Sequence, residues 1–201
     1  MKIHYCDQYS EEWALLRNGI PTASNFDRIV TPTGKLSAQR QKYLWQLAGE
    51  RLAGKPEETY KGAAMERGTV MEAEARSFYE LVTGEVPQQV GFCQTEGPAV
   101  YGCSPDFLVG ENGGGQIKCP LMTAHVSYLL ANEIPGEYVP QVQGELLVTG
   151  REWWDFLSYY PTIKPLKVRV YPDPKYQQIL KSALEEFCIE LNRTVEILKE
   201  R

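Results

Sequence analysis

The sequence predicts one domain, residues 1–201, of the α/β (α+β) class, with helices flanking a central mixed β-sheet. Two patterns lead to this prediction. Apolar residues recur three and four positions apart in several long segments, which is typical of amphipathic helices. Shorter runs rich in β-branched and aromatic residues lie between residues 89 and 171, bounded by Gly and Pro, and these are typical of strands. With 201 residues, 43% of them hydrophobic, the chain can bury a core of its own.

Helices account for most of the first 85 residues. Ser10 and Ser37 are suitable N-caps, because their side-chain oxygens can accept a hydrogen bond from a free backbone N–H group. Gly19 and Gly54 stand where helices commonly end. The expected helices span residues 11–17, 22–30, 37–52 and 62–82.

The second half of the chain alternates strands and helices. Four strands are expected at residues 89–95, 100–104, 106–109 and 116–119, and two more, at 152–160 and 166–171, are expected to close the sheet. Helices are expected at 124–130 and 138–150. A long amphipathic helix over residues 174–201 is expected to end the chain.

A tight β-hairpin is predicted within residues 102–120. The apolar run after Asp106 forms its first arm, and Gln116 begins the second. Asn112-Gly113 lies between the arms and is a strong hairpin signal, because both residues accept positive φ. Gln116 and Lys118 share one face of their strand, while Ile117 points to the other. The hairpin therefore brings a carboxylate, an amide and an ammonium group toward one point.

With a carboxylate at position 116, this hairpin would carry the D-x(9)-E-x-K pattern of a nuclease metal site. Two hard oxygen ligands hold Mg²⁺, and the metal lowers the pKa of a bound water. Lysine in that pattern can orient the water and stabilise the charged transition state. Short acid-x-lysine patterns are also common on exposed strand faces, so the pattern alone is not specific.

The flanking residues resemble the phage lambda exonuclease (YqaJ-like) family of alkaline exonucleases, in the PD-(D/E)xK superfamily. The resemblance rests on Ser104-Pro105-Asp106, on Lys118-Cys119-Pro120 and on the block from Arg17 to Ser24. It is extended by Gln141-Val142-Gln143. These blocks occur in the family's order and cover residues 13–160. The resemblance implies a restriction-endonuclease-like core.

The resemblance also implies a set of catalytic and metal-binding residues. Asp106, residue 116, the Ile117 carbonyl and Glu72 would hold Mg²⁺, for which Mn²⁺ can substitute. Lys118 and Gln141 would act on the attacking water, with Tyr138 facing the active site on the DNA side.

A second set of residues is implied for the DNA end. Arg17 precedes a helix N-terminus that carries Ser24, and such N-termini bind anions. Spacing alone favours an ordinary helix cap beside a surface arginine, but the resemblance implies that Arg17, Ser24 and Ser104 bind the terminal 5′-phosphate. Met65 aligns with an apolar residue that separates the strands at the duplex end, although ordinary packing fits it equally well.

A turn-rich loop precedes the helix at 37–52. Lys35 and Arg40 in and after this loop are candidates for contacts with DNA phosphates. A simple connecting loop explains them equally well.

Gln116 departs from the family, which has Glu at this position. An amide brings no negative charge and binds Mg²⁺ poorly. One interpretation is an engineered, catalytically impaired variant that traps a DNA complex. The other is a natural, inactive homologue.

Composition limits the remaining classes. A net charge of −5 and a pI of about 5.2 exclude a broadly basic surface, so any DNA contact must use local clusters of basic residues. Two distant histidines, His4 and His125, and five cysteines without a CxxC pair do not indicate a zinc site or a Ser-His-Asp triad. The sequence shows no P-loop, signal peptide or membrane-length apolar run, so a cytoplasmic protein is expected. The resemblance implies that it comes from a phage or prophage.

The function that the resemblance implies is a Mg²⁺-dependent 5′-to-3′ exonuclease. It would degrade the 5′-ended strand of double-stranded DNA and leave 3′ single-stranded overhangs for recombination by strand annealing. A ring-shaped homotrimer and a phage single-strand annealing protein would be its partners. Two alternatives stay open: a catalytically silent protein that binds DNA ends, and an endonuclease with the same metal core.

Overall fold

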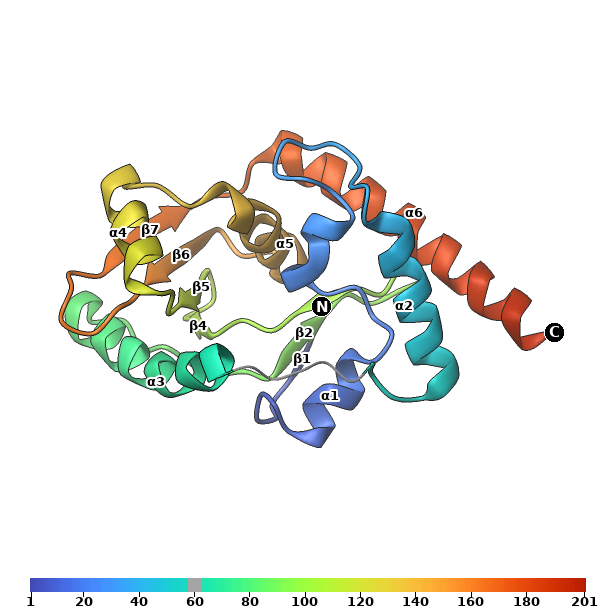
Figure 1. Ribbon diagram of the computed structural model, residues 1–201, viewed down its shortest axis with the longest axis horizontal. Coiled ribbons are helices and arrows are strands. Elements are labelled where there is room, and N and C mark those ends of the chain that lie inside the picture. The colour runs from blue at the N-terminus through green and yellow to red at the C-terminus, as the bar shows by residue number, and fades with distance from the viewer. Residues whose placement is uncertain (58–62) are drawn as a thin grey trace.

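Two β-sheets with helices on both sides form this chain, so the predicted mixed α/β class is confirmed (Figure 1). The computed structural model describes residues 1–57 and 63–201, and side chains outside 58–69. The helices are α1 (Glu11–Arg17), α2 (Arg40–Ala53), α3 (Ala63–Thr83), α4 (Met122–Ala131), α5 (Val139–Thr149) and α6 (Pro174–Lys199), with 3-10 helices η1 (Ala23–Arg28) and η2 (Gly136–Tyr138). The strands are β1 (Lys2–His4), β2 (Phe92–Gln94), β3 (Gly102–Cys103), β4 (Phe107–Val109), β5 (Gly113–Lys118), β6 (Trp153–Ser158) and β7 (Leu166–Val170).

The expected strands divide between the two sheets. The larger sheet has the order β4-β5-β6-β7, and it is mixed because β5 and β6 pair in parallel while its other pairs are antiparallel. The parallel pair is joined through α4 and α5, as a parallel connection requires a long crossover. The smaller sheet, β1-β2-β3, is antiparallel. Its first strand was not predicted, because three residues are too few to show a period.

Helices cover both faces of the larger sheet. Met71, Ala75 and Tyr79 of α3 pack on one face, in a cluster that includes Ile117. On the other face, α5 contributes to the main core, which also takes in α2 and α6. Figure 1 shows α3 running along one side of the β4–β7 sheet and α5 lying on the other. Residues on β5 therefore face α3 or α5 in alternation.

The predicted hairpin is present, but its turn differs from the prediction. The antiparallel pairs join Phe107 to Gly115 and Val109 to Gly113, which leaves residues 110–112 as a three-residue loop. The positive φ lies at Gly110, at +49°, and neither Asn112 nor Gly113 has one. The prediction of positive φ at Asn112-Gly113 was therefore wrong, because Gly113 is already the first residue of β5.

The hairpin loop is held from outside. Arg151, which precedes β6, donates through Nη1 to the carbonyl oxygens of Val109, Gly110 and Gly113, at 3.2, 2.9 and 2.6 Å. One guanidinium thus contacts both arms of the hairpin and its turn.

Several element boundaries differ from the predictions. α2 begins at Arg40, because the backbone N–H of Ser37 bonds to the Ile29 carbonyl and is held in a preceding turn. β5 begins at Gly113 instead of 116. Residues 23–28 form a 3-10 helix.

The described helices include none with the length and apolar content needed to cross a membrane.

Candidate active site

The predicted side-chain alternation on β5 is present. Gln116 and Lys118 lie on the α5 side, and Ile117 packs on the α3 side with Met71 and Tyr79. Asp106 stands directly before β4 and is paired with β5 through the hairpin. The three polar side chains of the motif therefore come together as the sequence indicated.

Asp106 and Gln116 are in direct contact and both are buried, at 7% and 5% exposure. The Gln116 Nε2 group donates a hydrogen bond to Asp106 Oδ2, which also accepts from the backbone N–H of Ile117. The same Nε2 lies 3.4 Å from the Ile117 carbonyl oxygen. The amide nitrogen is thus turned toward the two oxygens that were predicted to hold a metal.

Asp106 has an unusual protonation equilibrium. Its pKa is raised to about 7, mostly by burial and also by the nearby carboxylate of Glu72, while Lys118 opposes both effects. Burial likewise raises the pKa of Glu72, against the influence of Arg76 and Lys118. Glu72 pairs with Arg76 at 3.3 Å. The predicted metal residues Asp106 and Glu72 are therefore close enough to repel each other.

Lys118 faces this acidic group. Its Nζ lies 5.1 Å from the ring centroid of Tyr138, which can stabilise the cation through its π face. Its charge also interacts with Glu72, Asp106 and a third carboxyl, Glu145. Tyr138, predicted to face the active site, thus lies against the lysine.

Gln141 and Glu145 complete the cluster from α5. Gln141 Nε2 donates to Gln116 Oε1 at 2.7 Å and to Glu145 Oε1 at 2.9 Å. Glu145 is 1% exposed, and burial raises its pKa well above the usual range. The sequence prediction included Gln141 but missed Glu145. The sequence feature that could have identified Glu145 is its position between the apolar Val142 and Leu146, on a helix that was expected to face inward.

The oxygen donors here suit a divalent cation. Asp106 is a buried carboxyl that makes no ion pair within the described part of the chain, and it is repelled by Glu72. A bound cation would relieve both penalties. Among the described residues, no three Asp, Glu, His or Cys side chains form a metal-binding group. That is consistent with an amide at 116, whose oxygen must turn toward Asp106 before it can contribute.

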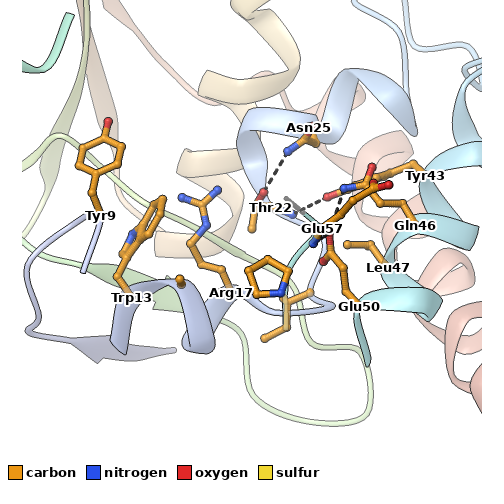
Figure 2. Close-up of a pocket in the computed structure, with 13 residues that line it drawn as sticks. Tyr9, Trp13, Arg17, Thr22, Asn25, Tyr43, Gln46, Leu47, Glu50 and Glu57 are labelled. Carbon is orange, nitrogen blue, oxygen red and sulfur yellow. Dashed lines mark hydrogen bonds between the residues drawn. The ribbon is translucent and has the colours of Figure 1, made fainter. Parts of the chain in front are cut away.

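Arg17 lines a pocket of about 310 Å³ (Figure 2), and it contacts Ser104. Arg17 Nη1 lies 3.3 Å from Ser104 Oγ, and its guanidinium stacks 3.9 Å from the centroid of Trp13. The Trp13 indole N–H also donates to Ser104 Oγ, at 2.9 Å. Arg17 has no carboxylate partner among the described ion pairs. Burial lowers its pKa, so this cation is poorly hydrated and favours an anion.

Trp13 was not among the predicted site residues. Its only sequence signal was an aromatic residue four positions before Arg17, on a helix that buries no residue completely. Figure 2 shows the Arg17 side chain drawn between those of Trp13 and Thr22.

Ser24 lies apart from Arg17 and is connected to it indirectly. It is exposed on η1, and its Oγ is 3.3 Å from Thr22 Oγ1, which lines the Arg17 pocket. Ser24 also lines a second pocket of about 210 Å³ together with Tyr138 and Gln141. It therefore stands between the predicted phosphate site and the predicted catalytic residues.

The remaining predicted DNA contacts are placed as follows. Lys35 is exposed. Arg40 pairs with Glu190 of α6 at 2.6 Å and lies over the Phe187 ring, so its charge is already partnered. The prediction for Met65 falls outside the described side chains.

One short segment, residues 104–106, joins the Arg17 pocket contact to the acidic cluster around Asp106. Ser104 contacts Arg17, and Asp106 contacts Gln116, with only Pro105 between them. Two residues span at most about 7 Å. Since proline fixes its own φ, this spacing is nearly rigid.

Fold and site together define the restriction-endonuclease-like class, in which an acid and a lysine meet on a β-hairpin of a mixed sheet. A family model described as the YqaJ-like viral recombinase domain matches residues 12–152. The chain belongs to this family.

Solved structures agree. An alkaline exonuclease (LHK-Exo) from Laribacter hongkongensis is 34% identical, with a TM-score of 0.86 over 95% of this chain and 97% of that one. The structure of LHK-Exo in complex with dAMP gives the same values. A phage related exonuclease from Haemophilus somnus 129PT shares the fold, at 15% identity and a TM-score of 0.66, over 87% of this chain and 96% of its own. No curated protein sequence matches significantly.

Proposed function

We propose that this protein is a Mg²⁺-dependent exonuclease that degrades the 5′-ended strand of double-stranded DNA. Family membership and the similarity to LHK-Exo support a nuclease. The observation that carries the finer proposal is the Ser104-Pro105-Asp106 segment, which links Arg17, a half-buried arginine outside the described ion pairs, to the acidic cluster. An anchor for a terminal phosphate would then lie a fixed, short distance from the cleavage point.

Each residue has a defined task in this proposal. Arg17 and Ser104 bind the 5′-phosphate, with the Trp13 indole orienting the serine hydroxyl. Asp106, the Ile117 carbonyl and Glu72, together with residue 116, hold Mg²⁺, which lowers the pKa of a water and neutralises phosphate charge when bound. Lys118 orients that water or takes its proton, and Tyr138 keeps the ammonium group in place. Gln141 donates to the carboxylate or amide at 116.

A second function is favoured by one observation. The Gln116 amide donates to Asp106, so the position of a metal ligand is taken by a hydrogen-bond donor. With this side chain the protein would bind DNA ends and cleave them slowly or not at all. The proposed exonuclease would also have two kinds of partner. It would form a ring-shaped homotrimer around DNA, and it would pass the 3′ overhang to a single-strand annealing protein.

The first prediction compares two duplex ends. In the Gln116→Glu variant with Mg²⁺, a 5′-phosphorylated duplex should be degraded at least tenfold faster than a 5′-hydroxyl duplex, because only the former can be held by Arg17. Strand-specific fluorescent labels measured on denaturing gels follow the rate and show which strand is lost. Equal rates on the two ends would remove the anchor.

Two controls belong to this experiment. Lys118→Ala in the Gln116→Glu background should stop cleavage, by a factor of about 10²–10⁴ for a group that acts on the water, and should leave DNA binding largely intact. Absence of any cleavage by Gln116→Glu itself would instead support the silent DNA-end binder.

A further inference from the structure

Two glutamine amides join two buried carboxyl groups across this site. Glu145 Oε1 accepts from Gln141 Nε2 at 2.9 Å, and the same nitrogen donates to Gln116 Oε1 at 2.7 Å. Gln116 Nε2 in turn donates to Asp106 Oδ2. The series Glu145–Gln141–Gln116–Asp106, called the relay below, crosses from α5 to the hairpin.

The relay fixes which end of each amide points where. A primary amide has two N–H groups on one nitrogen and acceptors only on its oxygen. Both N–H groups of Gln141 are used, one by Glu145 and one by Gln116. Gln116 must therefore present its oxygen to Gln141, which leaves its nitrogen toward Asp106 and the Ile117 carbonyl, 3.4 Å away. The N–H hydrogens of Gln116 then lie beside Asp106 and the Ile117 carbonyl, where a bound cation would need an oxygen ligand from residue 116.

We propose that Glu145 is a positioning residue that acts through Gln141 to hold the Gln116 nitrogen against Asp106, and thereby keeps the affinity for divalent cations low. The proposal rests on the metal site of the proposed function. Glu145 is suited to this role because its Oε1 is held as an acceptor and it is 1% exposed, so water cannot replace it as the partner of Gln141.

The relay also explains why the same α5 residues suit a carboxylate at 116. A glutamate there would accept from Gln141 as Gln116 does now, and would place its second oxygen, not a nitrogen, toward Asp106. The Gln141–Glu145 pair therefore orients a glutamate correctly for a cation and a glutamine incorrectly.

Simple electrostatics predicts no gain in cation binding for a change at 145. To the extent that Glu145 is charged, neutralising it should weaken cation binding, and to the extent that its raised pKa keeps it protonated, neutralising it should have no electrostatic effect. Neutralising it as Glu145→Gln should strengthen binding if the relay governs the site. The new amide can donate to Gln141, so Gln141 can turn over, and Gln116 can then turn its oxygen toward Asp106.

The chain contains a matched control for this change. On α2, Gln46 Nε2 donates to Glu50 Oε1 at 2.9 Å with the same spacing of four residues, and Glu50 is 8% exposed. This second pair has no contact with Gln116. Glu50→Gln therefore removes a buried acid from a Gln–Glu pair of the same spacing without touching the relay, although Glu50 also accepts from the backbone N–H of Gly19 at 3.1 Å.

The experiment measures Mn²⁺ binding by electron paramagnetic resonance. Glu145→Gln should bind Mn²⁺ about tenfold more tightly than the unaltered chain, within the range that supporting partners of metal ligands produce. Glu50→Gln should leave the Kd unchanged. Gln141→Leu should also tighten binding, because it frees Gln116, and adding Glu145→Gln to it should have no further effect. Weaker or unchanged binding in Glu145→Gln, or an equal gain in Glu50→Gln, would overturn the proposal.

A second readout needs no metal. The side-chain NH₂ resonances of Gln116, assigned from their loss in Gln116→Ala, should shift in Glu145→Gln and stay in place in Glu50→Gln. Unmoved resonances in a folded Glu145→Gln protein would disprove the relay whatever Mn²⁺ does. Gln116→Glu tests the metal site itself: if it binds no Mn²⁺ while the resonances shift as expected, the proposed function fails and the relay stands.

Discussion

Asp106 illustrates how one buried carboxyl makes the stability of the fold depend on pH. With its pKa raised to about 7 by burial and by Glu72, the folded protein retains a proton that the unfolded chain releases near its ordinary pKa of 3.8. Between these values the native state binds more protons than the unfolded state, so the free energy of unfolding falls as pH rises. In the proposed function the same proton would have to leave before a cation binds, so activity is expected on the alkaline side.

The residue-scale prediction concerns Asp106→Asn. Without divalent cations, the unaltered chain should lose stability from pH 5 to pH 7, and Asp106→Asn should lose less over that interval because the shifted group is gone. Urea unfolding at pH 5, 6 and 7 gives both curves. Glu111→Gln, at an exposed position in the hairpin turn, is the control and should follow the unaltered chain. Parallel curves for Asp106→Asn and the unaltered chain would contradict the raised pKa.

At the residue scale, the sequence predicted the hairpin acid and lysine, because a strand's two-residue period and a turn signal are local. The residues that contact this acid and lysine or the nearby Ser104 were harder to predict from the sequence. Glu145 was missed because its contact with Gln141 and Gln116 depends on how α5 docks on β5. Trp13 was missed because its hydrogen bond to Ser104 joins residues 91 positions apart.

At the scale of elements, β5 owes its shape to three glycines. A Cβ on Gly113 or Gly115 would lie 2.0 or 2.1 Å from the ring of Trp153 or Phe107, and one on Gly114 would lie 2.3 Å from the Trp154 ring. These aromatic rings fill the space that side chains would need, so the strand can lie close to its neighbours. From the sequence these glycines are expected in the turn, because glycine normally weakens a strand.

Gly114→Ala is the element-scale prediction. Trp154 is fully buried and cannot move aside, so the added methyl should reduce the free energy of unfolding by about 1–3 kcal/mol, as overpacking does. Chemical denaturation measures this change. Gly49→Ala is the matched control: it lies within α2 with nothing near its Cβ, and alanine there should stabilise by up to about 1 kcal/mol. An equal effect of the two substitutions would show that the Trp154 contact is unimportant.

The whole molecule is acidic, with a net charge of −5, and several of its basic side chains are partnered within the fold. Arg40 pairs with Glu190, and Arg169 and Lys167 pair with the fully buried Asp155. Arg17 and Lys118 take part in none of the described ion pairs. In the proposed function these two cations, one in the pocket and one on the hairpin, would meet the phosphates of a DNA end.

The whole-molecule prediction follows from that arrangement. The Gln116→Glu variant should leave a closed circular duplex intact and degrade the same DNA once it is linearised, because Arg17 and Ser104 require a free 5′ terminus. Agarose gels of both forms over the same time course measure this. Conversion of the circle to nicked or linear product would favour an endonuclease with the same core.

The hydrogen bonds from Arg151 to the hairpin determine when, during synthesis of the chain, the hairpin can become ordered. When a ribosome has just completed Lys118, the whole acid–lysine motif has been synthesised. Arg151, which holds the hairpin, lies 38 residues beyond Gly113 and has not yet been made. The strand that pairs in parallel with β5, β6, follows Arg151 in the chain. The acid–lysine hairpin is therefore expected to become ordered late in translation. A chain whose synthesis stops soon after Lys118 would contain the motif but lack Arg151 and β6, which hold the hairpin in place.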